Sequence, residues 1–141
     1  MRKPCFVYIF ARDCDGYAGG PVKIGISSDP DARLRAVQTG CPHRIIKLCH
    51  VYAHDREVAK NIEALIHLEL SDKRASGEWF NATPLEAVEA LLICFREALE
   101  AIGFSKQQFY EFASAGTGLA EVMERYLSAK AAAAADMGRP Q

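Results

Sequence analysis

The chain has 141 residues, of which 17 are basic and 18 are acidic, and half of its residues are hydrophobic. This length suits one compact domain with a short appendage, and the composition excludes a disordered chain. No apolar run approaches the roughly 18 residues that span a bilayer. The apolar stretch over 5–11 is short and is followed at once by Arg12 and Asp13. We therefore expect no secretory signal, no membrane partner and a cytoplasmic location.

The charges are unevenly distributed along the chain. Residues 1–80 carry 12 basic and 10 acidic side chains, whereas residues 81–141 carry 5 basic and 8 acidic ones. The imbalance is mild, and it permits a local phosphate-binding face only in the first part of the chain.

Short apolar runs separated by turn signals make up the first part of the chain. Residues 5–11 predict a buried strand and residues 22–27 a second one, joined by a nine-residue turn rich in Gly, Asp and Pro. The two runs pair most simply as an antiparallel hairpin. Asp29 and Pro30 then predict the start of a helix, as N-cap and first helical residue, and this helix ends near Gly40.

Helices dominate the rest of the chain. We expect a strand over 45–53, a helix over 55–70 and a polar loop over 71–77. Thr83 and Glu86 have the spacing of a capping box, and the helix that follows has an apolar stripe at helical spacing. The stripe consists of Leu85, Val88, Leu92, Phe95, Leu99 and Ile102.

These elements predict an α+β fold with a small three-stranded antiparallel sheet flanked by helices. We expect one domain over residues 1–103 and a helical extension over 104–141, beginning at Ser105 and running into the alanines at 131–135. The extension exceeds what a small domain needs. It therefore suggests a homo-oligomer formed through the C-terminal helices, or a helix-mediated assembly or regulatory protein.

Five cysteines, an odd number without a CxxC pair, predict neither a disulfide framework nor a zinc ribbon. Cys41, His43, Cys49 and His50 lie close together in the sequence and leave a zinc site as an alternative. Zinc ligands are usually paired at tighter spacing, so we interpret the cysteines as buried thiols in and around a strand.

An ordered set of short motifs is the most specific feature of the sequence. Val7-Tyr8-Ile9 lies in the first predicted strand and Lys23-Ile24-Gly25 in the second. Arg33 follows Gly25 by eight residues, Glu63 lies on the second helix, and Gly77-Glu78-Trp79-Phe80 comes later. Over roughly residues 5–92 this set resembles the GIY-YIG nuclease superfamily, in the phage and bacterial branch whose second signature reads Lys-Ile-Gly.

The resemblance implies divalent-metal-dependent hydrolysis of a phosphodiester, usually in DNA. It assigns the first-signature tyrosine to Tyr8, the arginine on the first helix to Arg33 and the metal-binding glutamate to Glu63. Lys23 stands where the family has a second tyrosine, which is a departure. Many members also have a late asparagine, and Glu78 occupies about that place with Asn81 close by.

These residue types suit phosphodiester chemistry. A guanidinium such as that of Arg33 stabilises charge on phosphate oxygens, and one carboxylate, Glu63, is enough to hold Mg²⁺ or Mn²⁺ beside a substrate phosphate. Tyr8 orients or deprotonates the attacking water, for which its phenol needs a nearby cation, and Lys23 is a candidate for that cation. His67, one helical turn from Glu63, relays a proton or orients the carboxylate.

Each of these residues also has a purely structural interpretation. Tyr8 can be a core tyrosine, Lys23 a polar side chain on the outer face of an edge strand, and Glu63 a surface partner of Lys60 or His67. The leading hypothesis is a DNA endonuclease with Tyr8, Lys23, Arg33, His67 and Glu78 as catalytic residues and Glu63 as metal ligand. Because Lys23 replaces a tyrosine, the alternative is a catalytically inactive nucleic-acid-binding module on the same scaffold.

Overall fold

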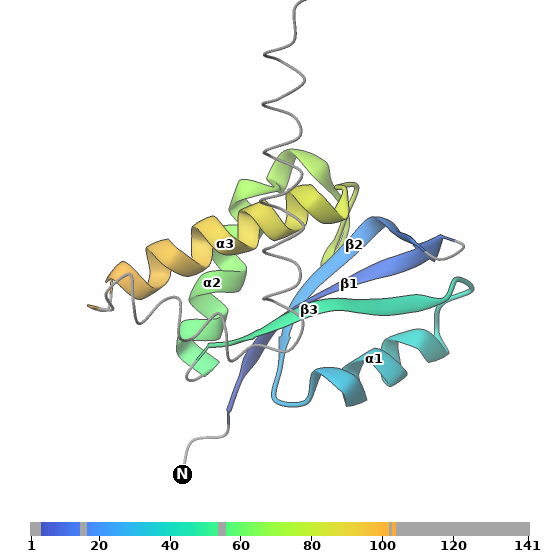
Figure 1. The fold of residues 1–141 in the computed structure, drawn as a ribbon, viewed down its shortest axis with the longest axis horizontal. Coiled ribbons are helices and arrows are strands. Elements are labelled where there is room, and N and C mark those ends of the chain that lie inside the picture. The colour runs from blue at the N-terminus through green and yellow to red at the C-terminus, as the bar shows by residue number, and fades with distance from the viewer. Residues whose placement is uncertain (1–3, 15–16, 54–55, 102, 104–141) are drawn as a thin grey trace, which may run out of the picture.

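The computed structural model describes residues 4–14, 17–53, 56–101 and 103, and it has an α+β fold (Figure 1). The elements in chain order are β1 (Phe6–Cys14), β2 (Tyr17–Ser27), α1 (Pro30–Thr39), β3 (Ile45–Tyr52), α2 (Arg56–Glu69), the 3₁₀ turn η1 (Ser71–Lys73), β4 (Arg74–Ser76), β5 (Trp79–Phe80) and α3 (Pro84–Ala101).

The sheet has five antiparallel strands in the order β3-β1-β2-β5-β4, so the expectation of three strands was wrong. β4 comes from the segment predicted as a polar loop over 71–77, and β5 from Trp79 and Phe80, which the sequence places at a loop-to-strand junction just after it. The two strands have three and two residues, too few for any alternation of polar and apolar side chains to be visible in the sequence. β5 is held in place by pairing with Val22 and Lys23 of β2, a contact that only the tertiary structure creates.

The hairpin of β1 and β2 is also longer than expected. Its strands pair out to Cys14 and Tyr17, so most of the predicted nine-residue turn belongs to the ladder. Gly19, which suggested a turn, lies inside β2 and pairs with Arg12 of β1, and a Cβ there would come within 2.6 Å of Cys14 Sγ. Glycine therefore allows a close approach at this position.

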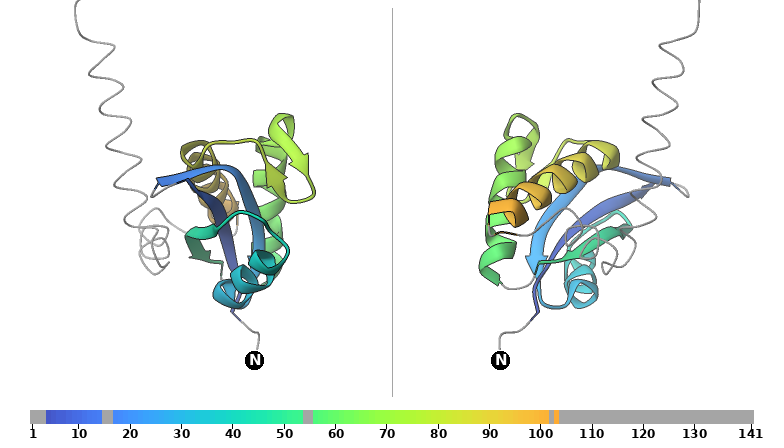
Figure 2. Two further views of the ribbon diagram at one scale, coloured as in Figure 1. Left: turned by 90° about the vertical axis from the view of Figure 1, so that its right-hand side faces the viewer. Right: turned by 60° about the vertical axis from the view of Figure 1, so that its left-hand side comes forward.

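Helices cover both faces of the sheet. Figure 1 shows α2 and α3 packed together on one face of the sheet and α1 on the other. The right-hand view of Figure 2 separates these two faces most clearly. Alternation along the strands sends Val7, Ile9 and Ile24 toward α2 and α3, where they join the larger hydrophobic core. Tyr8 and Phe10 point the other way and join a smaller cluster under α1.

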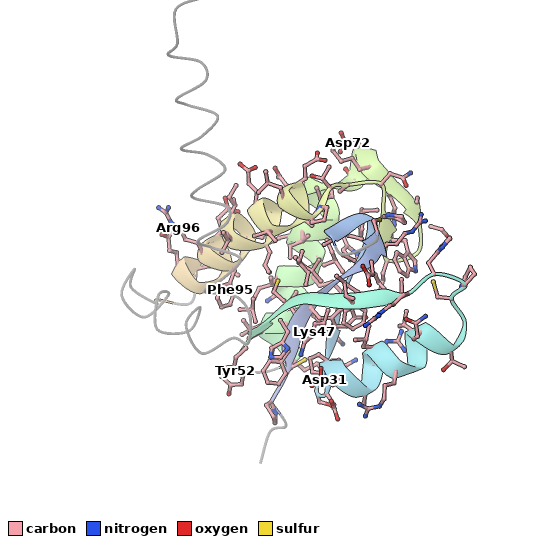
Figure 3. The ribbon with its side chains drawn as sticks, turned by 45° about the vertical axis from the view of Figure 1, so that its right-hand side comes forward. Asp31, Lys47, Tyr52, Asp72, Phe95 and Arg96 are labelled. Atoms are coloured by element: carbon pink, nitrogen blue, oxygen red, sulfur yellow. The ribbon has the colours of Figure 1, made fainter. Side chains whose placement is uncertain are left out.

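Helix α1 begins as the sequence predicted. Asp29 Oδ1 accepts a hydrogen bond from the Ala32 N–H at 3.1 Å, Pro30 is the first helical residue, and Gly40 follows the last turn. An ion pair of 2.7 Å joins Asp31 of α1 to Lys47 of β3, and Figure 3 shows the two side chains directed toward each other. These contacts fix the helix across the sheet face that carries Tyr8.

Helix α3 confirms the predicted capping box. The Glu86 N–H donates to Thr83 Oγ1 at 3.1 Å, and the Thr83 N–H donates to Glu86 Oε1 at 3.0 Å. The predicted stripe is correct for Val88 and Phe95, but Leu85 is 45% exposed. Leu92 packs against the core as well, and the buried side also includes Ala87, Leu91 and Cys94. Ile102 and the side chain of Leu99 lie outside the described residues.

No helix in the described part of the chain has the length and apolar character needed to cross a membrane. The predicted helices from Ser105 onward, and the oligomer proposed to form through them, lie outside the described residues.

Candidate active site

The site is organised around Gly25 in the middle of β2. Gly25 is opposite Tyr8 of β1 in the sheet register. A Cβ at position 25 would overlap the Tyr8 hydroxyl and lie 2.8 Å from Glu78 Oε2. Both polar groups therefore lie directly over the glycine backbone. The glycine of the Lys-Ile-Gly motif is required because any larger residue would fill the space that these two groups share.

Tyr8 is a buried phenol on the sheet face under α1, with its hydroxyl over Gly25 of β2. Its ring stacks on Phe10, with centroids 4.0 Å apart, and the side chain is 1% exposed. Burial raises the pKa of the phenol, and a hydrogen bond from the Arg33 guanidinium opposes that rise. The cation beside Tyr8 is therefore Arg33 rather than Lys23, which corrects the expected pairing.

Arg33 comes from the first turns of α1, directly after the Asp29 cap. Its backbone N–H donates to Asp29 O at 3.0 Å, so the helix start fixes its position. The residue is exposed, and its contact with Tyr8 raises the pKa of the guanidinium. The site therefore has one permanent cation that is both anchored to the phenol and open to solvent.

Lys23 lies two residues before Gly25 on the same face of β2. The strand is central in the sheet, flanked by β1 and β5, and Lys23 is only 7% exposed, so the edge-strand interpretation was wrong. Its Nζ is 2.8 Å from Glu78 Oε2 and 5.8 Å from the centroid of the Trp79 ring. A buried ammonium needs such a partner, and Glu78 supplies it.

Glu78 reaches this cluster from the short β4–β5 hairpin. Gly77, with φ +57°, makes the turn, and Arg74 Nε donates to its carbonyl at 2.8 Å. The Glu78 carbonyl in turn accepts the Ile24 N–H at 3.1 Å, which fixes the hairpin to β2. Asn81, the other candidate in this segment, is exposed and donates its backbone N–H to Lys73 O. Glu78 is thus the side chain from this segment that contacts Lys23.

His67 of α2 hydrogen-bonds to the backbone of β2. Its Nε2 is 3.0 Å from the Ile24 carbonyl, and because a carbonyl oxygen only accepts, Nε2 carries the proton. The ring also packs against Phe80, with centroids 5.0 Å apart. This contact satisfies a backbone group that the two-residue β5 leaves without a ladder partner.

Glu63, one helical turn before His67, is half-buried and faces the same cluster. Burial raises the pKa of its carboxyl and the nearby Glu78 carboxylate raises it further, while His67, Lys23 and Arg56 lower it. Its Oε2 is buried and has no hydrogen-bond partner among the described residues. A buried carboxylate oxygen without a partner is costly, and such an atom in a native structure usually has a functional reason.

The residues around Glu63 fit a hard cation in one particular way. Within the described ranges, no group of three or more His, Cys, Asp or Glu side chains is arranged to hold a metal ion. The zinc alternative for Cys41, His43, Cys49 and His50 therefore has no support among these described residues. Mg²⁺ typically keeps several waters and binds through one or two carboxylates plus a substrate phosphate. Glu63 Oε2, which has no hydrogen-bond partner among the described residues, could supply such a protein oxygen.

The six residues singled out from the sequence lie on five different elements or turns and converge on the middle of β2. They are Tyr8, Lys23, Arg33, Glu63, His67 and Glu78. Sequence reasoning missed Trp79 as a partner of Lys23, since an aromatic at a loop-to-strand junction is interpreted first as packing. The signal available was its position next to Glu78, on a strand paired with Lys23.

The sheet with helices on both faces is compatible with a GIY-YIG-like, nuclease-type fold. The model of the T5orf172 domain family matches residues 5–97, and the chain belongs to that family. The matched range contains all six residues of the cluster. No curated protein and no solved structure matches the chain.

Proposed function

We propose that this chain is a divalent-metal-dependent endonuclease that hydrolyses phosphodiester bonds in DNA. The observation that carries the proposal is the convergence of a phenol, an ammonium, a guanidinium and two carboxylates on one glycine of the central strand. Membership of the T5orf172 domain family, which has a nuclease-type fold, supports the same class of activity.

In this proposal water adds across a P–O bond, so that its oxygen ends on phosphorus and its hydrogen on the leaving oxygen. Arg33, exposed and anchored to Tyr8, binds the non-bridging oxygens on which negative charge develops. Lys23 still has donors free after its bond to Glu78 and binds a second phosphate oxygen. The hydrogen bond to Glu78 holds the Lys23 ammonium in position for this contact.

Tyr8 orients the attacking water rather than deprotonating it. Burial raises the pKa of the phenol, so the hydroxyl keeps its proton at neutral pH and acts as a hydrogen-bonding group. Glu63 would hold Mg²⁺ or Mn²⁺ through its unpartnered Oε2. When bound there, the metal supplies Lewis-acid polarisation of the phosphate. His67 positions the carboxylate by fixing the edge of β2 beside α2.

Nicking of supercoiled plasmid in Mg²⁺ or Mn²⁺ tests the proposal, with chelator as the blank. Glu63→Gln and Arg33→Gln each remove one charged group at nearly constant size, and we expect each to slow nicking by about 10² to 10³-fold. Glu69→Gln and Arg35→Gln are the matched controls, because both residues are exposed and lie on the same two helices. Loss of nicking in the controls as well, or its persistence in the two site variants, would refute the assignment.

A second candidate is an inactive nucleic-acid-binding module, which the Lys23–Glu78 ion pair favours. An ammonium stands where the resemblance expects a tyrosine, and it is already neutralised by a carboxylate. In that case the parent protein binds DNA without metal-dependent nicking, and Arg33→Gln weakens binding while Glu63→Gln does not.

A further inference from the structure

A small pocket opens next to the polar cluster on the same face of the sheet. It has a volume of about 140 Å³, and its exposed wall atoms are apolar. Its lining residues are Arg12, Pro21, Cys41, His43, Ile45 and Trp79. None of them belongs to the six residues of the proposed active site. The pocket is therefore distinct from the proposed catalytic residues, and its ligand is a separate question.

The pocket and the cluster are continuous along β2. Pro21, Lys23 and Gly25 alternate onto one face of the strand, so that the pocket, the ammonium and the phenol follow one another in that order. Two residues along a strand span about 6.6 Å. Trp79 links the two sites, since it lines the pocket and also lies under Lys23 Nζ.

The shape and lining of the pocket select a flat aromatic ligand. Drug-sized ligands occupy pockets of about 300–1,000 Å³, whereas an apolar cavity of about 150 Å³ holds a single six-membered ring. The indole of Trp79 and the imidazole of His43 are planar side chains, on which rings can stack. One ring of nucleobase size fits this volume.

The charges at the rim suit a ligand that carries phosphate. Arg12 is part of the wall, Lys23 lies beyond Trp79, and the side chain of Arg44 is 79% exposed nearby. Two carboxylates lie on this side as well: Asp13 is 3.6 Å from Arg44 Nε, and Glu78 is 2.8 Å from Lys23 Nζ. An apolar slot with Arg12 in its wall and the exposed Arg44 next to His43 in the sequence is complementary to a nucleotide, whose base is apolar on its faces and whose backbone is anionic.

The loop that forms one wall is held in place before any ligand binds. Gln38 of α1 donates from Nε2 to His43 O at 2.9 Å and accepts at Oε1 from the Ile45 N–H at 2.7 Å. These bonds fix the connection between α1 and β3, which contributes Cys41 and His43. A pre-formed slot binds a ring without first having to order the loop.

We propose that this pocket holds a nucleobase of the DNA strand whose phosphate lies at Lys23 and Arg33. The inference rests on the proposed function, because it places the base beside the phosphate to be cut. It also predicts whether the bound DNA is paired at this point. A base that enters the pocket must be unstacked, so the strand is single-stranded or locally opened there.

Trp79 gives a direct readout, since it is the one tryptophan in the sequence. A short oligothymidylate is titrated into the full chain in chelator, beside an abasic oligonucleotide with the same number of phosphates. We expect the thymidylate to quench Trp79 fluorescence and the abasic strand to leave it nearly unchanged. Equal quenching by both, or by neither, overturns the proposal.

Two variants locate the ligand while keeping Trp79. His43 is exposed, so His43→Ala leaves the core intact, and we expect it to weaken thymidylate binding by about 5-fold or more while abasic binding is unchanged. Arg12→Gln weakens both strands equally, and Arg96→Gln on α3 is its matched control. Unchanged thymidylate affinity in His43→Ala overturns the proposal.

The nicking assay separates this result from the proposed function. Base-dependent quenching without metal-dependent nicking keeps the pocket and refutes the nuclease. Nicking without base-dependent quenching keeps the nuclease and refutes the pocket.

Discussion

The two faces of the sheet bury very different material. Under α2 and α3 the strands present an apolar surface, and both helices add buried aliphatic residues such as Ile62, Ile66 and Leu91. Under α1 the cluster is smaller, and Pro30 is the buried residue of that helix. The face under α1 instead carries Tyr8 and Lys23. One face thus supplies the stability that lets the other bury polar groups.

Truncations in the two cores should give the largest contrast in stability. Ile66→Ala removes a fully buried side chain from the face under α2, and we expect a loss of about 2–5 kcal/mol in the free energy of unfolding. Leu34→Ala removes a half-buried side chain of α1 and should cost less than half as much. Chemical denaturation measures both, and equal losses would remove the distinction between the two faces.

Gly25→Ala tests the crowding at the centre of the site. The added Cβ overlaps the Tyr8 hydroxyl and approaches Glu78 Oε2, so we expect a loss of about 1–3 kcal/mol from overpacking and a loss of nicking. Gly40→Ala is the control, because nothing lies within 4 Å of a Cβ there and its φ of −97° suits alanine. Should both variants be equally stable, the close approach at Gly25 is absent in solution.

Glu63→Gln should stabilise the fold while slowing nicking. Burial raises the pKa of Glu63 above its usual 4.5, so at neutral pH the fold contains a carboxylate whose ionised form it disfavours. Removing that charge should therefore raise Tm slightly at neutral pH. The gain should be present at pH 7 in chelator and disappear near pH 4, where the parent carboxyl is protonated. Thermal melts at the two pH values provide the measurement, and a lower Tm at pH 7 would argue against an unpartnered buried oxygen.

His50 should make the smallest contribution, visible only in acid. It is 9% exposed beside Phe6, its Nδ1 has no hydrogen-bond partner in the described part of the chain, and burial lowers its pKa below 6.5. Lys47 lowers that pKa further, and Asp31 opposes the change. The unfolded chain therefore takes up a proton first, and stability falls as the pH drops below about 6.5.

This loss amounts to at most about 1.4 kcal/mol for each pH unit between the two pKa values. In His50→Gln the decrease of Tm between pH 7 and pH 5 should be smaller than in the parent protein. An identical decrease would show that other groups cause it.

Local signals in the sequence predicted the elements whose cause is local. The caps at Asp29 and at Thr83 with Glu86 are confirmed, because a cap depends on side chains three residues away. The strands β4 and β5 were missed for the opposite reason. Their residues carry little strand signal. β5 pairs with Val22 and Lys23 of β2, more than 50 residues earlier in the chain, and β4 joins the sheet by pairing with β5.

The same division applies to the candidate site. The motif order pointed to the six residues, yet it paired Lys23 with Tyr8 and left the partner of Glu78 open. The structure pairs Lys23 with Glu78 and Tyr8 with Arg33, since register and helix placement decide which charged groups meet. The pocket beside Trp79 left no signal, because its walls come from four strands and one loop.

The sequence by itself determined where the helices begin, which side chains are available for chemistry, and the family to which the chain belongs. Only the tertiary structure decided that five strands form one sheet and that Gly25 brings a phenol and a carboxylate together. The physical reason is one of range. Capping and periodicity act over a few residues, whereas strand pairing, burial and ion pairing act between atoms that the fold alone brings close.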